Sequence, residues 1–225
     1  AEFPGLHREN TRLVPNGLRV EPQPPTALRA ELGIAPDAPV VLGVGGLEAR
    51  KGFQHLVTAL PSLPGVHAVI AGTGPAHRKA ALLDLAANLG VGDRFHLLGH
   101  RTDIPGLLEA ADAFALPSQD DTMPNALLEA MAVGCPAVMT EVGGVREMLG
   151  PRGHRPAAGW VVPVDDGDAL TAAIAEIIDL VRRGHPGVTE RTDEARWRMR
   201  HWYGADQMVA RYEALLAGRG EEAHS

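Results

Sequence analysis

The chain has 225 residues, of which 45% are hydrophobic, and a formal net charge of −7 at pH 7. This length accommodates one domain with a sizeable core, and the acidic balance excludes a general nucleic-acid surface, which requires a basic face. The single cysteine, Cys135, excludes an internal disulfide, and no apolar run is long enough to span a membrane. With no recognisable signal peptide, we expect a cytoplasmic protein.

The first 39 residues are expected to be a connector rather than part of the core, because seven prolines interrupt them. Within this connector, residues 12–17 (RLVPNG) predict a brief strand that ends in an Asn-Gly turn. The alternative for these residues is a simple turn. Residues 26–32 predict one short helix.

Strands and helices alternate over residues 40–184, which we predict to be the core domain. Continuous apolar runs are typical of strands buried on both faces, and apolar residues at helical spacing indicate helices. Strands are predicted at 40–44, 67–71, 95–98, 113–116, 137–140 and 159–163. Helices are predicted at 53–60, 82–89, 104–108, 124–133, 145–149 and 170–181. This order implies an α/β fold with a single doubly wound parallel sheet of about six strands. Residues 185–225 predict one or two C-terminal helices that pack back on the core.

A glycine-rich loop follows the first predicted strand and ends where a helix begins. Such a loop can place backbone N–H groups against a phosphate, with Lys51 and Arg50 neutralising a diphosphate. The glycine pair Gly45-Gly46 is a weak signal by itself, and the loop lacks the GxGxxG pattern of dinucleotide-binding proteins.

Two acids after the fourth predicted strand, Asp121 and Glu129, are separated by seven residues. We expect Asp121 or Thr122 to cap the next helix, with Pro124 in its first turn. Eight residues of helix make about two turns, so both carboxylates can face one cleft and accept hydrogen bonds from sugar hydroxyls. The helix N-terminus between them suits a phosphate. The alternative is a solvated helix with acids near its start.

The loops after the predicted strands share one edge of the sheet, because all the strands are expected to be parallel. Ligands of such sheets bind outside the carboxyl ends of the strands. The loops concerned are 45–52, 72–75, 99–101, 117–124 and 143–145. Their common position supports a ligand site more strongly than any one motif does.

The acidic segment resembles the signature of the retaining GT-B glycosyltransferases of family 4, also called group 1. In that family an acid is followed after seven residues by Glu, then by Ala-Met-Ala and Gly-x-Pro. This chain matches with Asp121, residues 129–132 (EAMA) and residues 134–136 (GCP). The resemblance covers about residues 12–215 and extends to further segments of the family pattern, Pro15-Asn16-Gly17, Lys51-Gly52 and residues 72–75 (GTGP).

The resemblance implies a Rossmann-like fold that forms the C-terminal, donor-binding half of a two-domain GT-B enzyme. The N-terminal, acceptor-binding domain is expected to precede residue 12 and to be missing from this chain. Glu129 would bind the donor's ribose, Asp121 and Lys51 would be the catalytic residues, and His100 and Arg101 would contact the nucleobase. The alternative for His100 and for Arg101 is an exposed loop residue. The donor site implied by the resemblance comprises Gly45, Gly46, Arg50, Lys51, Gly74, His100, Arg101, Asp121, Thr122, Met123, Pro124, Asn125 and Glu129.

Two positions depart from the family pattern. Asp121 stands where the family usually has Glu, so its carboxylate is one methylene shorter. Gly46 stands where the family often carries an arginine that helps to hold the phosphates, and Arg50 could replace it from a nearby position.

The resemblance implies a bacterial-type hexosyltransferase that moves a hexose from a UDP- or GDP-sugar to an acceptor with retention, without a metal or other cofactor. We expect the isolated chain to bind the donor but to be inactive alone, and the full enzyme to be cytoplasmic or peripheral to a membrane. Two alternatives stay open: another GT-B enzyme, such as a nucleotide-sugar epimerase, and a non-catalytic module that binds a nucleotide or a protein. The adjacent Asp165 and Asp166 are more typical of helix caps than of a metal site.

Overall fold

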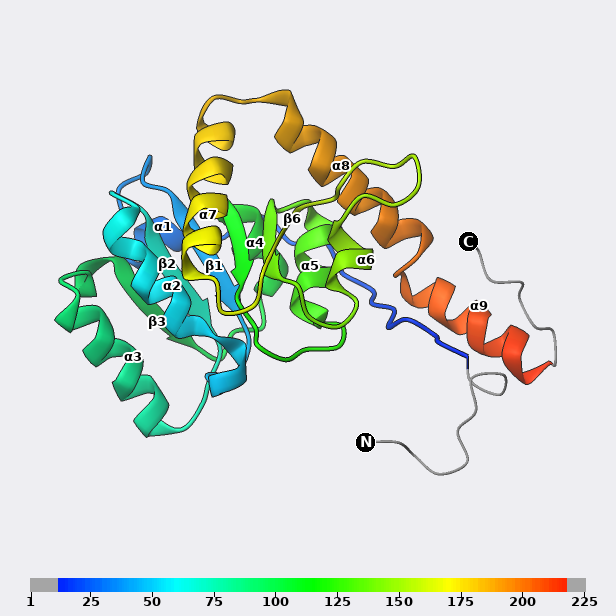
Figure 1. Ribbon diagram of the computed structural model, residues 1–225, viewed down its shortest axis with the longest axis horizontal. Coiled ribbons are helices and arrows are strands. Elements are labelled where there is room, and N and C mark those ends of the chain that lie inside the picture. The colour runs from blue at the N-terminus through cyan, green and yellow to red at the C-terminus, as the bar shows by residue number, and fades with distance from the viewer. Residues whose placement is uncertain (1–11, 218–225) are drawn as a thin grey trace.

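The computed structural model describes residues 12–217, which fold around one six-stranded sheet (Figure 1). The strand order is β3-β2-β1-β4-β5-β6, and every neighbouring pair is parallel. The order reverses between β1 and β4, so the sheet is doubly wound and Rossmann-like, as predicted. The strands are β1 (Val40–Val44), β2 (His67–Ala71), β3 (Phe95–Gly99), β4 (Ala113–Leu116), β5 (Ala137–Thr140) and β6 (Trp160–Val162).

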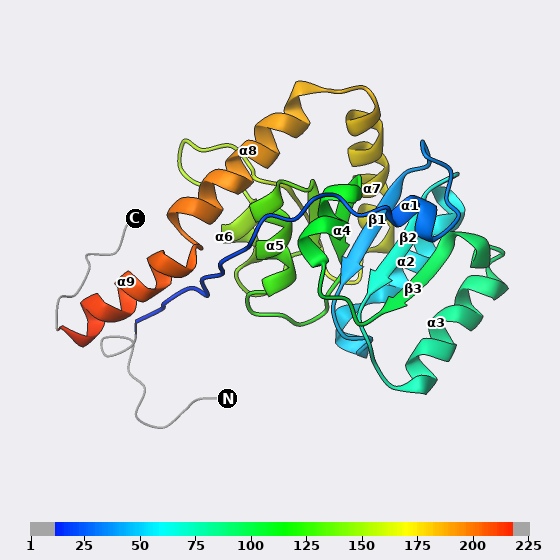
Figure 2. The ribbon, with the colours of Figure 1, turned by 180° about the vertical axis from the view of Figure 1, so that it is seen from behind.

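Helices cover both faces of the sheet (Figures 1 and 2). On one face α2 packs against α3 and α7, and on the other α5 packs against α4 and α8. The central strands β1, β4 and β5 are therefore buried along their whole length, which explains their unbroken apolar runs. The α-helices are α1 (Leu28–Glu31), α2 (Phe53–Ala59), α3 (Ala76–Asn88), α4 (Ile104–Ala110), α5 (Asn125–Val133), α6 (Val145–Leu149), α7 (Gly167–Arg182), α8 (Pro186–His201) and α9 (Ala205–Leu216). Three 3-10 turns accompany them, η2 (Ala49–Lys51), η3 (Leu60–Ser62) and η4 (Gly92–Arg94).

The strands lie where the apolar runs predict them, to within one residue at each end. The helix after β2 begins earlier than predicted, at Ala76, because its first turns are exposed and carry no apolar stripe. The connector helix α1 is shorter than predicted. The C-terminal region contains two helices within the described residues, one of the two arrangements predicted.

The strand predicted over residues 12–17 is absent, because its neighbours are helical elements and not an edge of the sheet. The backbone N–H groups of Asn16 and Gly17 donate instead to sulfur, at 3.1 Å from Met123 Sδ and 3.2 Å from Met208 Sδ. The extended segment thus lies between the start of α5 and helix α9.

The start of α5 corrects a second prediction. The helix begins at Asn125, Pro124 occupies the N-cap position, and no side chain caps the helix. Asp121 and Thr122 lie in the preceding loop, and the Asp121 carboxylate bonds to Lys51 rather than to helix amides. The ion pair with a cation from another loop was not visible in the local sequence.

A buried arginine anchors helix α8 to α6 and to the loop that follows α6. Arg198 has no exposed side-chain surface, and its Nε donates to a Glu194 carboxylate oxygen at 2.8 Å. The rest of its guanidinium donates to backbone carbonyls of residues 147, 148, 150 and 156. Helix α9, in contrast, has no buried residue and projects beyond the sheet beside the connector (Figures 1 and 2). An ion pair of 2.8 Å between Arg19 and Asp206 joins the two.

Among residues 12–217, no helix combines the length and the apolar character that crossing a bilayer requires. Cys135 lies buried at the end of α5, and this burial raises the pKa of its thiol. A thiol that stays protonated is a poor nucleophile, so Cys135 is a packed small side chain.

A histidine pair between β2 and β3 is expected to make the fold sensitive to acid. His67 Nδ1 lies 3.1 Å from His96 Nε2, and the two rings stack. Burial lowers the pKa of both side chains, and the charge of Arg94 lowers the pKa of His67 further. Because these pKa values are depressed in the folded state, the unfolded state binds more protons below about pH 6.5, and the free energy of unfolding falls there as the pH drops.

Denaturant titrations at about pH 7 and about pH 5 measure this effect. The parent should lose more stability between the two pH values than a His67→Gln/His96→Gln double variant does. Equal losses in the two proteins would show that the pair does not govern the acid response.

Candidate active site

The order in which the strands follow one another reverses between β1 and β4, and the loops after these two parallel strands lead to helices on opposite faces. The two loops are in direct contact, because the Gln119 N–H donates to the Arg50 carbonyl at 2.7 Å. Gly52 adopts a left-handed conformation with φ of 67°, and a Cβ there would collide with the Pro117 carbonyl oxygen. Glycine therefore allows an approach that no other residue permits.

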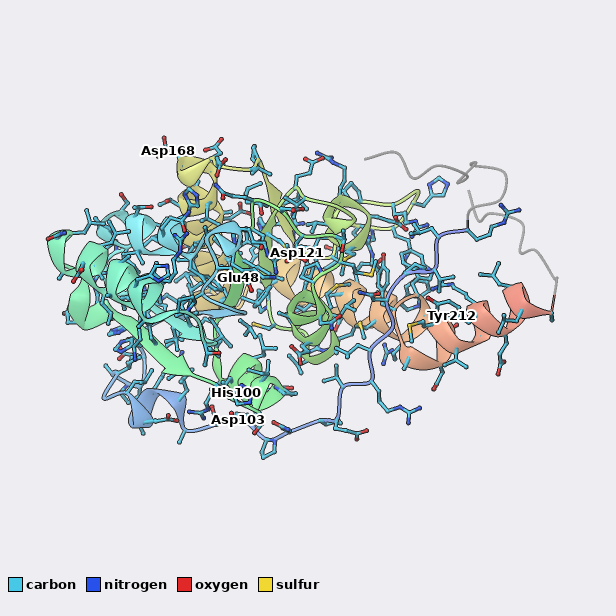
Figure 3. All side chains as sticks on the ribbon, turned by 90° about the horizontal axis from the view of Figure 1, so that it is seen from below. Glu48, His100, Asp103, Asp121, Asp168 and Tyr212 are labelled. Atoms are coloured by element: carbon cyan, nitrogen blue, oxygen red, sulfur yellow. The ribbon has the colours of Figure 1, made fainter. Side chains whose placement is uncertain are left out.

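Beyond this contact the loops separate and form an open cleft of about 440 Å³. The loop after β1 forms one wall, the end of the loop after β4 and the first turns of α5 form the other, and the connector closes one side. Figure 3 shows Glu48 and Asp121 close together, whereas His100 and Asp103 lie apart from them. The cleft is lined by Asn16, Val44, Gly45, Gly46, Glu48, Arg50, Lys51, Asp121, Met123, Pro124, Asn125, Ala126 and Glu129.

A nearly buried ion pair joins the two walls of the cleft. Lys51 Nζ lies 2.5 Å from Asp121 Oδ2, and the two side chains are only 13% and 12% exposed. The amine comes from the loop after β1 and the carboxylate from the loop after β4. The pair therefore links the two loops across the cleft.

A second and more exposed ion pair lies within the loop after β1, which forms one wall of the cleft. Arg50 Nε lies 2.7 Å from Glu48 Oε2, and the side chains are 48% and 53% exposed. A further guanidinium nitrogen of Arg50 donates to the Asp120 carbonyl at 3.3 Å. Both cations that line the cleft thus have a carboxylate partner.

Glu129 differs from the other charged residues of the cleft, because it has no hydrogen-bond or ion-pair partner within residues 12–217. Its side chain is half-buried on α5, and this burial raises the pKa of the carboxyl group. Beside it, the first turn of α5 carries the backbone N–H groups of Asn125 and Ala126, which have no intrahelical acceptor. The wall therefore offers donors for an anion next to an acceptor for hydroxyl groups.

The loop that carries Asp121 is also held from the side of β5. Gly144 N–H donates to the Thr122 carbonyl at 2.9 Å. Gly143, with φ of 47°, lies so close to Asp121 and Thr122 that a Cβ would collide with their carbonyl oxygens. The loops after β1, β4 and β5 therefore form one packed unit, which explains the glycines at both flanks.

Most of the predicted donor-site residues come together in the cleft. They are Gly45, Gly46, Arg50, Lys51, Asp121, Met123, Pro124, Asn125 and Glu129. Two others support the walls without lining them: a Cβ at Gly74 would lie 2.7 Å from Leu47 Cβ, and Thr122 supplies the carbonyl bonded by Gly144.

The two residues predicted to contact the nucleobase lie outside the lining of the cleft. His100 is exposed after β3. The Arg101 guanidinium donates to Asp103 at 2.8 and 2.6 Å and to Glu31 at 2.6 Å, so its donors already serve α1 and the start of α4. Contact between these residues and a base stays a prediction.

Two polar residues of the cleft were not predicted. Asn16 reaches the cleft because the connector folds back on the start of α5, where its side-chain amide donates to the Met123 carbonyl at 3.4 Å. The Pro-Asn-Gly sequence predicted a turn, but it did not predict that this turn would lie beside the start of α5. Glu48 is an acid inside a glycine-rich loop, two residues before Arg50, and that spacing is the one local signal of an interaction.

In the part of the chain that the structure describes, no three His, Cys, Asp or Glu side chains gather closely enough to hold a metal ion. Of the two adjacent acids before α7, Asp166 caps the helix as predicted and accepts a hydrogen bond of 2.8 Å from the Ala169 N–H, whereas Asp165 accepts one of 2.7 Å from the Gln119 side chain.

Comparison with known proteins finds glycosyltransferases among the relatives of this chain. A family model described as "Glycosyl transferases group 1" matches residues 38–179. The lipopolysaccharide core biosynthesis glycosyltransferase LpsE of Rhizobium meliloti (strain 1021) is 33% identical over 164 residues, which cover 70% of this chain and 46% of that protein. The chain spans about half the length of the curated relatives it matches.

Solved structures show the same fold. Sucrose-phosphate synthase from Thermosynechococcus elongatus is similar with a TM-score of 0.77 and 26% identity, over 92% of this chain and 52% of that chain. Anabaena HepE, solved in complex with UDP-glucose, is similar with a TM-score of 0.73 and 25% identity, over 85% of this chain and 51% of that chain.

Proposed function

Because the chain belongs to the group 1 glycosyltransferase family and has the fold of its C-terminal GT-B domain, we propose that it binds the nucleotide-sugar donor of a retaining hexosyltransferase. The donor is a UDP- or GDP-sugar, no metal is needed, and a further domain binds the acceptor. One observation carries this proposal: cations, helix amides and the carboxylate of Glu129 lie together in one cleft, at the point where the strand order of the sheet reverses.

In this proposal, each charged group of the cleft binds a different part of the donor. Glu129 accepts hydrogen bonds from ribose hydroxyls, Asp121 contacts the sugar, and Lys51 and Arg50 face the diphosphate together with the first-turn amides of α5. When the bond between the anomeric carbon and the phosphate oxygen breaks, negative charge grows on the diphosphate, and these donors stabilise it. The anomeric carbon bonds to an acceptor oxygen, and the proton of that hydroxyl leaves with the diphosphate.

The similarity to Anabaena HepE supports uracil as the base, because that protein was solved with UDP-glucose. The cleft volume of about 440 Å³ lies in the range of small-molecule sites. Within the cleft, the donors for phosphate lie on both walls, so a diphosphate would bridge them.

Calorimetric titration of UDP, GDP and ADP tests the proposal, and we expect selective binding of UDP or GDP. The chain has two lysines, Lys51 in the cleft and Lys79 exposed on α3. Lys51→Met should weaken binding of the diphosphate on the order of tenfold, because a charge-assisted hydrogen bond contributes about 1.5–3 kcal/mol. Lys79→Met is the matched control and should bind as the parent does.

Either of two results would overturn the proposal. The folded chain could bind none of the three nucleotides, or the two lysine variants could weaken binding equally. Circular dichroism of each variant establishes that it is folded before titration.

A second candidate function is nucleotide binding without turnover, and the ion pair between Lys51 and Asp121 favours it. The two proposed catalytic residues neutralise each other in this pair. Adding a UDP-sugar together with the acceptor-binding domain of a group 1 relative distinguishes the candidates. Formation of a glycoside supports transfer, whereas tight donor binding with no product supports the module.

A further inference from the structure

We propose that Glu48 sets the affinity of the cleft for a diphosphate, by pairing with Arg50 and releasing it when the phosphates bind. This inference rests on the proposed function. It concerns a residue that the family pattern does not mark, in the loop where Gly46 replaces the usual arginine. The structure contributes three observations: the position of the carboxylate, the charge of the cleft and the unequal exposure of its two ion pairs.

The carboxylate of Glu48 lies beside the point from which a side chain at position 46 would extend. Glu48 is the residue before η2, and it lines the cleft together with Gly46 and Arg50. One carboxylate oxygen, Oε1, lies 3.2 Å from the place that a Cβ on Gly46 would occupy. The other, Oε2, bonds to Arg50 Nε at 2.7 Å. Glu48 therefore covers Gly46 and reaches Arg50 at the same time.

The charge of the cleft makes Glu48 matter for an anionic ligand. The lining contains two cations, Arg50 and Lys51, and three carboxylates, Glu48, Asp121 and Glu129, so its formal net charge is −1 when all are ionised. A diphosphate entering this cleft meets cations that are already neutralised. A phosphate oxygen that takes the Arg50 Nε as its donor must displace Glu48, because that nitrogen bonds to the carboxylate.

The two ion pairs differ in how easily they open. The side chains of Lys51 and Asp121 are 13% and 12% exposed, whereas those of Arg50 and Glu48 are 48% and 53% exposed. A solvated pair is weak, and a carboxylate released from it regains water at little cost. We infer that the pair of Arg50 and Glu48 opens first.

Arg50 stays in position when Glu48 leaves. One of its guanidinium nitrogens donates to the Asp120 carbonyl, and its own carbonyl accepts from Gln119, so the loop after β4 holds the residue at two points. The freed guanidinium presents parallel donors that fit two phosphate oxygens. Arg50 then acts as the second phosphate-binding cation, and Glu48 is the residue that controls its availability.

Titration of UDP, UMP and uridine into a Glu48→Gln variant tests the proposal. The substitution keeps the shape of the side chain and removes its charge, so UDP should bind roughly two- to fivefold more tightly than to the parent, the value of an exposed ion pair. UMP should gain less, and uridine should bind as before. Glu176→Gln, which removes an exposed charge on α7, is the matched control and should change none of the three affinities.

A double variant, Glu48→Gln/Arg50→Met, shows whether the gain passes through Arg50. If it does, the gain for UDP disappears when Arg50 is absent. A single variant that binds UDP as the parent does, or more weakly, overturns the role of Glu48 while leaving donor binding by the parent intact. Failure of the parent to bind any nucleotide overturns the proposed function and this inference together.

Discussion

Replacing Arg198 by leucine is expected to lower the free energy of unfolding by about 3–5 kcal/mol, the usual effect of removing one partner of a buried ion pair. Arg198 has no exposed side-chain surface, and it satisfies the carboxylate of Glu194 and four backbone carbonyls. A leucine fills part of the space but donates no hydrogen bond. The carbonyls would then be buried without partners, which costs more than the bonds themselves contributed.

The loss of stability should exceed that caused by breaking an isolated salt bridge, because the carbonyls of α6 and of the loop behind it lose their hydrogen-bond donor at the same time. Glu194 keeps one partner, Arg155, at 2.6 Å, so its charge is not wholly uncompensated. Urea unfolding at about pH 7 measures the change. Arg200→Leu, an exposed arginine of the same helix, is the control and should alter stability by less than about 0.5 kcal/mol. Similar losses in the two variants would contradict a special role for Arg198.

Replacing Glu129 by glutamine is expected to weaken UDP binding on the order of a hundredfold. In the proposed complex the carboxylate accepts hydrogen bonds from two ribose hydroxyls, each worth about 1.5 kcal/mol or more, and a factor of ten corresponds to about 1.4 kcal/mol. Glutamine has the same shape but carries no charge, and one of its two ends donates instead of accepting. Calorimetric titration at about pH 7 measures the loss.

The same substitution should stabilise the protein when it is measured without added nucleotide. Burial raises the pKa of Glu129, and it has no hydrogen-bond or ion-pair partner within residues 12–217. A carboxyl whose pKa is higher in the folded state binds protons more tightly there, so the free energy of unfolding falls as the pH rises between the unfolded and the folded pKa. Above both values the ionised group destabilises the fold, and Glu129→Gln removes that penalty. The thermal midpoint at about pH 7 should therefore rise.

Weaker binding together with higher stability is a combination that general damage to the fold does not produce. Glu176→Gln serves as the control, and it should change neither quantity. Loss of binding with a lowered thermal midpoint would instead assign Glu129 a structural role. Unchanged UDP affinity would remove Glu129 from the site.

The sheet could be predicted from local sequence because its strands are buried on both faces. Runs such as residues 40–44 and 113–116 contain only apolar residues and glycine, and the structure buries them completely. Helix bounds were less accurate where burial is weaker. The first turns of α3 are exposed, so they carry no periodic apolar residues from which its start at Ala76 could be predicted.

Two local predictions failed where a distant contact decided the outcome. Asp121 was expected near the helix amides, but a lysine seventy residues earlier in the chain competes for the carboxylate and pairs with it. Residues 12–17 were expected to form a strand, but no strand edge lies beside them, and two methionine sulfurs accept their N–H groups. In both cases the competing partner is far away in sequence.

The sequence by itself determined the parallel α/β architecture, the edge of the sheet where the cleft lies, and most residues of the cleft. It could do so because burial on both faces requires apolar runs, and close loop contacts require glycine, so both leave local signals. Only the tertiary structure decided how the charges of the cleft are paired: Lys51 with Asp121, Arg50 with Glu48, and Glu129 with none among the described residues. It also brought Asn16 to the cleft. Ion pairs depend on distances between loops that the chain separates widely, and no local pattern records such distances.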